Sequence, residues 1–335
     1  METRVQTVCL VVISTVLTGA ALYWLRPMMV PFVLALFITL GLHAAAEFLQ
    51  DRLKVPRSLA MVSTLFLGFG LLVGMASLVS VSVGELTSKA DLYNQHLSQL
   101  AERALSIIPA EWRPAQEAAL AQIPVSTVGG FLARTANAIA NTLSNSFVVL
   151  IFVLFLMIGG GRRRAQGVWG EAERRIKRYI ATKALISLAT GFLVGLTLVL
   201  LGVPLALVFG MFAFMLNFIP SIGSIFATLM PLPILVVSPE VPLQIAVAAI
   251  AIPAAIQLTV GSFLEPKIMG ESLDLHPVTI LLCLILWGML WGVIGMILSV
   301  PITVVLKILC ERFEGSRPVA DLLAGRIAAL SSGSE

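Results

Sequence analysis

The chain has 335 residues, of which 58% are hydrophobic and only 12% charged, and its mean hydropathy is +0.99. Soluble domains carry about a quarter charged residues, so this composition excludes an ordinary soluble enzyme or binding module. The net charge of +4 does not indicate nucleic-acid binding, because the basic residues cluster beside apolar runs. In that position they orient a chain in a membrane and contact lipid phosphates.

Several apolar runs exceed the length of about 18 residues that crosses a hydrocarbon core. They are continuous rather than alternating, which excludes the strands of an outer-membrane barrel. The sequence therefore predicts an all-α fold, a polytopic transmembrane helical bundle. The three cysteines, Cys9, Cys283 and Cys310, have no metal-ligand spacing, so we expect no metal and no cofactor.

Residues 1–83 are predicted to hold the N-terminal transmembrane helices. The first apolar run, at about 5–25, could be a signal peptide, but Arg26-Pro27 and a second run from Met28 to Ala46 follow it at once. This continuation favours a membrane helix. A third run at 58–83 comes after a basic segment, which indicates a cytoplasmic loop.

Residues 84–137 have an ordinary composition. Apolar residues between Leu86 and Ile108 recur at steps of mostly three, four or seven, the pattern of one face of an amphipathic helix. Positive and negative charges are nearly balanced there, as is typical of a translocated segment. We predict a small extracytoplasmic helical segment.

The transmembrane core is predicted at 138–310. The run Arg162-Arg163-Arg164 and the basic residues up to Lys183 predict a cytoplasmic helix at 162–183 lying on the inner leaflet. A nucleic-acid or regulatory patch is the alternative interpretation. The remaining residues, 311–335, are predicted to form a cytoplasmic tail. Counting the spans by the positive-inside rule places the amino terminus in the cytoplasm as well.

Two apolar regions, 204–237 and 277–309, are each too long for one simple membrane helix, and each is interrupted in its middle. The first interruption runs from Asn217 to Ser224 and the second from Trp287 to Gly295. These features predict two broken or re-entrant helical hairpins.

The two broken regions resemble each other. Pro204 precedes Gly223 by 19 residues, and Pro277 precedes Gly295 by 18. A single span at about 243–260 separates the regions, so the two hairpins would enter the membrane from opposite sides. This arrangement is an inverted repeat, which is common in secondary transporters. Chance alignment of glycines and prolines, both frequent in membrane helices, is the alternative.

Catalytic patterns are absent from the sequence. It has no zinc-protease motif, nucleophile elbow, phosphate-binding loop or dinucleotide fingerprint. We therefore predict that the chain is not an enzyme and that it hydrolyses no ATP. Transport driven by an ion gradient, or a passive path, remains.

Polar groups at membrane depth are the candidate site, because such groups usually line a solute or ion path. Glu265 and Lys267 are the ion-coupling candidates; they could pair, or Glu265 could carry a proton or a sodium ion. Helix caps and interhelical hydrogen bonds are the plainer roles for Asn217 and the serines, and an interfacial salt bridge for Glu265 and Lys267. The substrate-binding candidates are Asn217, Pro220, Ser221, Gly223, Ser224, Gln257, Gly292 and Gly295.

Short segments, most of them in the last third of the chain, form a recognisable set. They are Phe218-Ile219-Pro220-Ser221-Ile222-Gly223, Phe263-Leu264-Glu265-Pro266-Lys267-Ile268-Met269-Gly270, His276-Pro277 and Trp291 to Pro301, with Arg26-Pro27 and Pro31 near the start. Together they resemble the autoinducer-2 exporter family of bacterial permeases. One departure is Ser224, where many relatives have a proline after the glycine.

The resemblance implies a bacterial inner-membrane permease that forms a homo-oligomer and exports the quorum-sensing signal autoinducer-2. Some relatives are assigned to sodium or lithium/proton antiport. Three functions stay open: export of a small polar organic solute, cation/proton antiport, and an uncoupled channel-like role. In each case the expected partners are a small molecule or ion and the membrane lipids.

Overall fold

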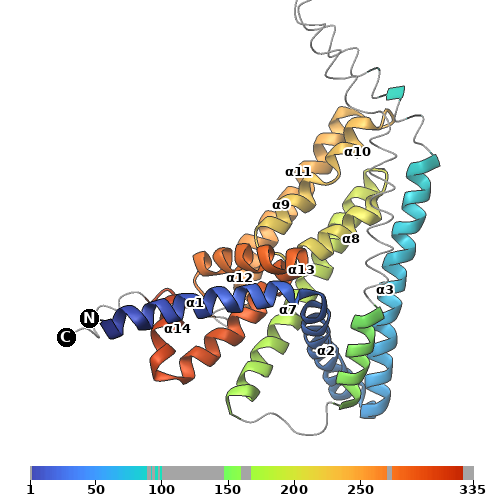
Figure 1. Ribbon diagram of the computed structural model, residues 1–335. Helices are drawn as coiled ribbons and strands as arrows, with labels where there is room; N and C mark the ends of the chain where they lie inside the picture. Colours follow the sequence, from blue (N-terminus) through green and yellow to red (C-terminus); the bar gives the residue numbers. More distant parts are fainter. Residues whose placement is uncertain are drawn as a thin grey trace, which may run out of the picture.

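The structure is a computed structural model that describes residues 2–88, 92, 95, 96, 99, 147–159, 167–269 and 274–326. All regular secondary structure in these ranges is helical, with no strand (Figure 1). The predicted all-α class is confirmed. Nearly all of the predicted extracytoplasmic segment at 84–137, and the arginine run at 162–164, lie outside the described residues.

The described helices follow the apolar runs of the sequence. They are α1 (Glu2–Trp24), α2 (Arg26–Leu53), α3 (Arg57–Ser88), an unlabelled helix at Phe147–Gly159, α7 (Val168–Leu200), α8 (Ala206–Leu216), α9 (Ile222–Leu229), α10 (Leu232–Val237), α11 (Leu243–Thr259), a π-helical turn (Val260–Leu264), α12 (Glu265–Met269), α13 (Pro277–Arg312), a 3-10 turn (Glu314–Ser316) and α14 (Arg317–Leu323).

Within the described ranges, four helices are long and apolar enough to cross a membrane. Many of their large apolar side chains point outward, Leu185 and Phe192 of α7 among them, which is what a lipid-facing surface requires. Together with the shorter apolar helices they form a polytopic bundle. The four are Arg26–Arg52, Gly170–Leu200, Leu243–Leu264 and Pro277–Arg312.

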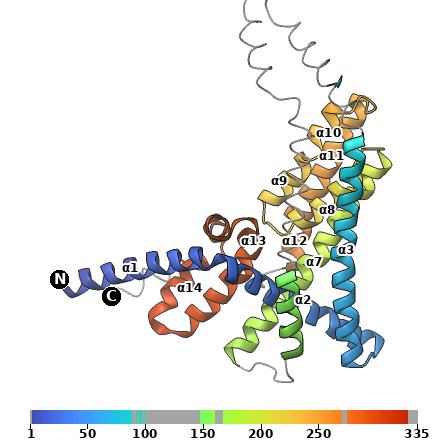
Figure 2. The same ribbon diagram turned by 45° about the vertical axis from the view of Figure 1, so that its right-hand side comes forward.

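Helix α7 occupies the centre of the bundle, and α2, α8, α11 and α13 all pack against it. In both views α1 extends away from α8 to α11 and lies beside α13 (Figures 1 and 2). The indole Nε1 of Trp291 donates to the Leu22 carbonyl at 3.1 Å, which attaches α1 to α13.

The predicted separate basic helix at 162–183 is replaced by part of a longer helix. Helix α7 begins at Val168 and continues without a break to Leu200, because no glycine or proline interrupts the chain around Lys183. One side of its first half is buried against α13 and α2, through Tyr179 and Ile176 respectively. These residues therefore belong to the packed core.

The contact between α7 and α8 depends on glycines. A Cβ on Gly210 would lie 2.7 Å from the Gly195 Cα and 2.8 Å from the Gly191 carbonyl oxygen. Small residues allow helix backbones to approach this closely inside a membrane, where packing rather than water drives association.

Replacing Gly210 with alanine should therefore destabilise the bundle by about 1–3 kcal/mol, the usual cost of overpacking. Gly74→Ala is the matched control, because no atom lies within 4 Å of a Cβ at that position. Thermal unfolding in detergent micelles measures both. Equal stability of the two variants would show that α7 and α8 do not pack through Gly210.

Candidate functional site

The first broken region is a tight turn between α8 and α9. Ser221 takes the left-handed φ of 59°, and a Cβ on Gly223 would lie 1.8 Å from the Leu216 carbonyl oxygen. Only glycine fits there, because the start of α9 presses on the last turn of α8. The broken region 204–237 then continues through α9 and α10 as short helices.

The second broken region is a kink inside α13. Gly292 has φ 66° and ψ −146°, which is not helical. A Cβ on Gly295 would lie 2.0 Å from the Trp287 carbonyl oxygen, so the second half of α13 folds closely onto the first. The Trp287 and Trp291 rings, whose centroids are 5.0 Å apart, pack at the same bend.

Both breaks thus have the same construction. A residue with positive φ, Ser221 or Gly292, comes two or three positions before a glycine that lies on the carbonyl seven or eight positions before it. The agreement in backbone geometry goes beyond the glycine and proline spacing of the sequence. It supports the hypothesis of an inverted repeat, which predicts that the two turns act as a pair.

Helix α7 has a buried polar stripe on the side that faces these elements. Lys183, Ser187 and Thr190 are each 1% exposed or less, and their spacing of four and three places them on one face of the helix. The Asn217 Nδ2 donates to the Ser187 Oγ at 3.0 Å, and both side chains are buried. This bond joins the first broken region to α7.

Glu265 forms an ion pair with Lys183, since the Lys183 Nζ donates to the Glu265 Oε1. The suggested pairing of Glu265 with Lys267 is not seen among the described residues, where Lys267 is exposed and Glu265 pairs with Lys183. The sequence did not indicate Lys183 as the partner of Glu265, because Lys183 lies 82 residues away in the chain, on α7.

A π-helical turn at Val260–Leu264 sets the direction of Glu265. Gln257 and Glu265 are eight residues apart, which in a regular α-helix places side chains about 80° apart around the axis. A π-turn accommodates one extra residue, so the carboxylate is rotated back toward the side of Gln257. Turns of this kind occur frequently at functional sites.

Gln257 is a buried amide that lacks hydrogen-bond partners among the described residues. It is 5% exposed, and neither its Oε1 nor its Nε2 is bonded. Since buried polar groups are nearly always satisfied, an amide of this kind on the buried face of α11 is suited to bind a solute.

A scan against family models matches residues 12–315 to the AI-2E family transporters. The chain belongs to the AI-2E transporter family. AI-2 transport protein TqsA of Escherichia coli (strain K12) is 31% identical over 311 residues, which cover 88% of this chain and 89% of the relative. "Putative transport protein YhhT" of the same strain is 26% identical, with 92% of both chains covered. A "Putative transport protein" of Haemophilus influenzae is 30% identical, with 88% of this chain and 89% of the relative covered. Family membership identifies a multi-pass membrane transport protein.

In this AI-2E protein the predicted site residues fall into two groups. Asn217, Gln257, Gly223 and Gly295 are buried, and Glu265 is half-buried in its ion pair. The others lie at or near the two turns: Pro220 and Ser224 are half-buried, and Ser221 and Gly292 are exposed.

Sequence reasoning missed Lys183, Ser187 and Thr190 of this transporter. The available signal was a set of polar residues at positions i, i+4 and i+7 that interrupts the apolar face of a membrane helix. Lys183 was counted instead with the basic residues of the preceding segment, because it comes first in the apolar span.

Removing one member of the buried pair should destabilise the protein more than removing an exposed charge. We expect Glu265→Gln to lower the free energy of unfolding by about 3 kcal/mol, because it leaves the Lys183 ammonium buried without its anion. The matched control is Glu171→Gln, which breaks an exposed ion pair between Glu171 and Arg175, both on α7. This substitution should cost less than about 1 kcal/mol. Unfolding in detergent compares them, and equal losses would mean that the Glu265 pair is not buried in the folded protein.

Proposed function

We propose that this chain is a secondary permease of the bacterial inner membrane that exports a small polar organic solute. Autoinducer-2 is the first candidate cargo, since the relative TqsA is named for AI-2 transport. The observation that carries the proposal is the ion pair between buried Lys183 and half-buried Glu265, one turn of α7 from Ser187, which bonds Asn217 of the first broken region. Charged pairs at membrane depth are costly and mark solute or ion paths.

The two breaks supply backbone groups for a polar solute. The turn at Pro220 to Ser224 precedes the eight-residue helix α9. The Ile222 and Gly223 N–H groups donate to carbonyls of the turn, so the amides that follow them in the first turn of α9 are the ones without a partner in the helix. The kink at Gly292 to Gly295 frees backbone groups in the same way. Together with Asn217 and the free amide of Gln257, these groups can bind hydroxyl and carbonyl oxygens while neighbouring helices move around them.

The ion pair determines which movements of charge the site tolerates. In a low-dielectric interior the site is most stable when its net charge is zero. Protonation of Glu265 leaves Lys183 as an unpaired cation, so a proton binds favourably only together with a negatively charged solute oxygen that pairs with Lys183, or when Lys183 loses its own proton. Proton binding and solute binding are coupled through the same two side chains.

The same charge rule favours a second candidate function, sodium (or lithium)/proton antiport. A metal cation that binds Glu265 must displace Lys183, and the site stays neutral only if the lysine releases its proton. One cation would then be exchanged for one proton. An uncoupled channel has no need of such a pair.

Topology and assembly complete the proposal. The basic segments of the chain favour both termini in the cytoplasm by the positive-inside rule, and the family resemblance favours a homo-oligomer surrounded by lipid. Cysteines placed near each end and labelled from one side of intact cells would test the orientation.

Glu265→Gln should abolish gradient-driven transport. The purified protein is reconstituted in liposomes, and flux of autoinducer-2, and of protons in exchange for sodium or lithium, is followed under imposed proton and sodium gradients. Glu171→Gln, outside the site, should retain wild-type flux. Gradient-driven flux that survives in Glu265→Gln would remove this carboxylate from the mechanism. Gradient-driven flux of autoinducer-2 would favour the exporter, and proton flux driven by sodium or lithium would favour the antiporter. Flux that does not depend on either gradient would contradict coupling.

Gly223→Ala should reduce transport by more than tenfold while the protein still inserts in the membrane. The added Cβ meets the Leu216 carbonyl and forces the first break open, and displacements of this size at a site commonly cost about a hundredfold. Gly74→Ala serves again as the control. A normal rate in Gly223→Ala, with normal expression, would show that the break is not part of the path.

A further inference from the structure

A second buried lysine, Lys307, lies in the half of α13 that follows the Gly292 kink. Its side chain is 2% exposed. The Nζ donates to the Asp274 Oδ2 at 2.6 Å and to the Asp274 carbonyl oxygen at 2.7 Å, and Glu311 lies 3.3 Å away. The charge of this lysine is thus compensated almost entirely by Asp274 and Glu311.

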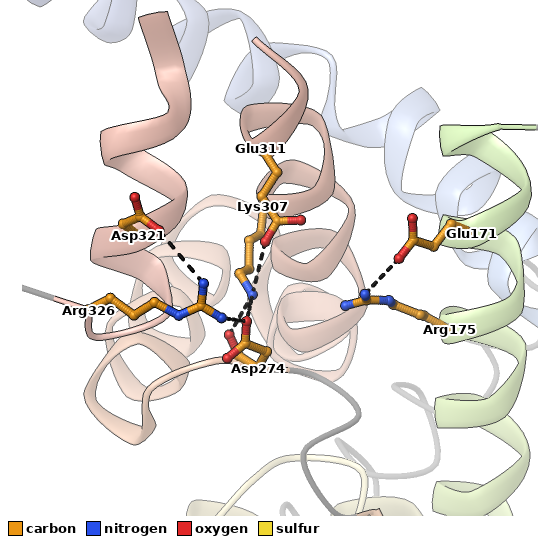
Figure 3. Close-up of polar contacts among 7 residues, drawn as sticks. All are labelled: Glu171, Arg175, Asp274, Lys307, Glu311, Asp321 and Arg326. Atoms are coloured by element: carbon orange, nitrogen blue, oxygen red, sulfur yellow. Dashed lines mark hydrogen bonds and ion pairs between the residues drawn. The ribbon is translucent and has the colours of Figure 1, made fainter. Parts of the chain in front are cut away.

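Asp274 is shared between Lys307 and the carboxyl end of the described chain. The Arg326 Nη2 contacts the same Oδ2 at 2.6 Å, as Figure 3 shows. Asp274 has a φ of 46°, a left-handed conformation that aspartate tolerates better than most residues. Three polar contacts fix the residue in this conformation.

The fold of the chain after α13 places Arg326 beside Asp274. After α13 ends, the Ser316 Oγ donates to the Cys310 carbonyl at 2.9 Å, and α14 packs back on α13. Helix α14 then ends in a Schellman motif: the Gly325 N–H donates to the Leu322 carbonyl at 3.0 Å and the Arg326 N–H to the Asp321 carbonyl at 2.8 Å. Gly325 has the required positive φ of 76°.

His276 makes a second attachment to α14. Its backbone N–H donates to the Leu323 carbonyl at 3.1 Å, while its Nδ1 accepts from the Val278 N–H at 3.3 Å and caps α13. The imidazole packs on Gly325, where a Cβ would lie 2.6 Å from its Cδ2. The chain from Asp274 to His276 is therefore held through both its backbone and its side chains.

We propose that residues 313–326 form a latch that holds segment 274–276 and thereby restrains the Glu265 segment against Lys183. Leu275, between Asp274 and His276, packs against the cluster that includes Ala172 and Tyr179 of α7, so the latch holds the segment that follows α12 against the helix that carries Lys183. Its consequence for transport rests on the proposed function, whereas the restraint itself does not. Residues 313–326 are then a positioning element that controls the opening of the site.

Arg326 is the member of the latch that can release. Its side chain is 57% exposed, whereas that of Lys307 is 2% exposed. When Arg326 leaves, Lys307 and Asp274 still neutralise each other, so the buried lysine is not stranded. Release of the latch is thus compatible with a folded protein.

Hydrogen exchange measured by mass spectrometry in lipid nanodiscs tests the latch directly. In Arg326→Glu, we expect the amides of residues 265–282 to exchange about fivefold faster, the change that loss of a half-exposed ion pair permits. Arg326→Lys should restore most of the protection. Arg175→Glu, which breaks the exposed pair with Glu171 (Figure 3), should leave these amides unchanged.

Faster exchange confined to residues 317–326 would mean that the tail merely frays, and it would overturn the proposal. Equal acceleration in Arg326→Glu and Arg175→Glu would also overturn it. The exchange measurement needs no solute, so the latch and the proposed function fail separately. A wild-type protein without gradient-driven flux would contradict the proposed function, whereas the exchange rates alone decide whether the latch exists.

Discussion

A lysine ammonium buried in a helical bundle needs an anion, and the arrangement around α7 follows from that need. Lys183 is 1% exposed, and an isolated charge in such a place would cost several kcal/mol. Glu265 meets the requirement from α12, and the π-turn before it gives the carboxylate its direction. The pair binds the α11 to α12 segment to the central helix. It also makes the protonation of one side chain depend on the state of the other.

Glycines supply the second constraint, because they bring main chain against main chain where no side chain fits. Gly223 and Gly295 each lie on a carbonyl seven or eight residues earlier in the chain, and each comes two or three positions after a residue with positive φ. Helix interruptions of this kind are tolerated in a membrane only where protein or a cavity surrounds them. The first break is joined to α7 through Asn217 and Ser187, so the broken helices and the ion pair belong to one packed unit.

Much of the fold could be predicted from the sequence, because membrane helices are specified locally by apolar run length and by glycine and proline. The all-α class and the positions of both breaks were found in this way. The partner of Glu265 could not be found, since the pair joins residues 82 positions apart and only packing brings α12 to α7. Lys183 was misread because a basic residue at the start of a span resembles a topogenic charge, although its face of α7 is buried. The contacts of Asp274 with Lys307 and Arg326 were missed for a similar reason, as they depend on how α14 folds back.

The central claim is that Lys183 and Glu265 pair with each other inside the lipid-embedded protein. Solid-state NMR on protein in bilayers, with the lysine Nζ labelled with ¹⁵N and the glutamate Cδ with ¹³C, measures this distance directly, and variants at each position assign the signals. We expect strong dipolar coupling between Lys183 and Glu265, corresponding to a separation of less than about 4 Å. Coupling of Glu265 to Lys267 instead, or to no lysine at all, would contradict the account.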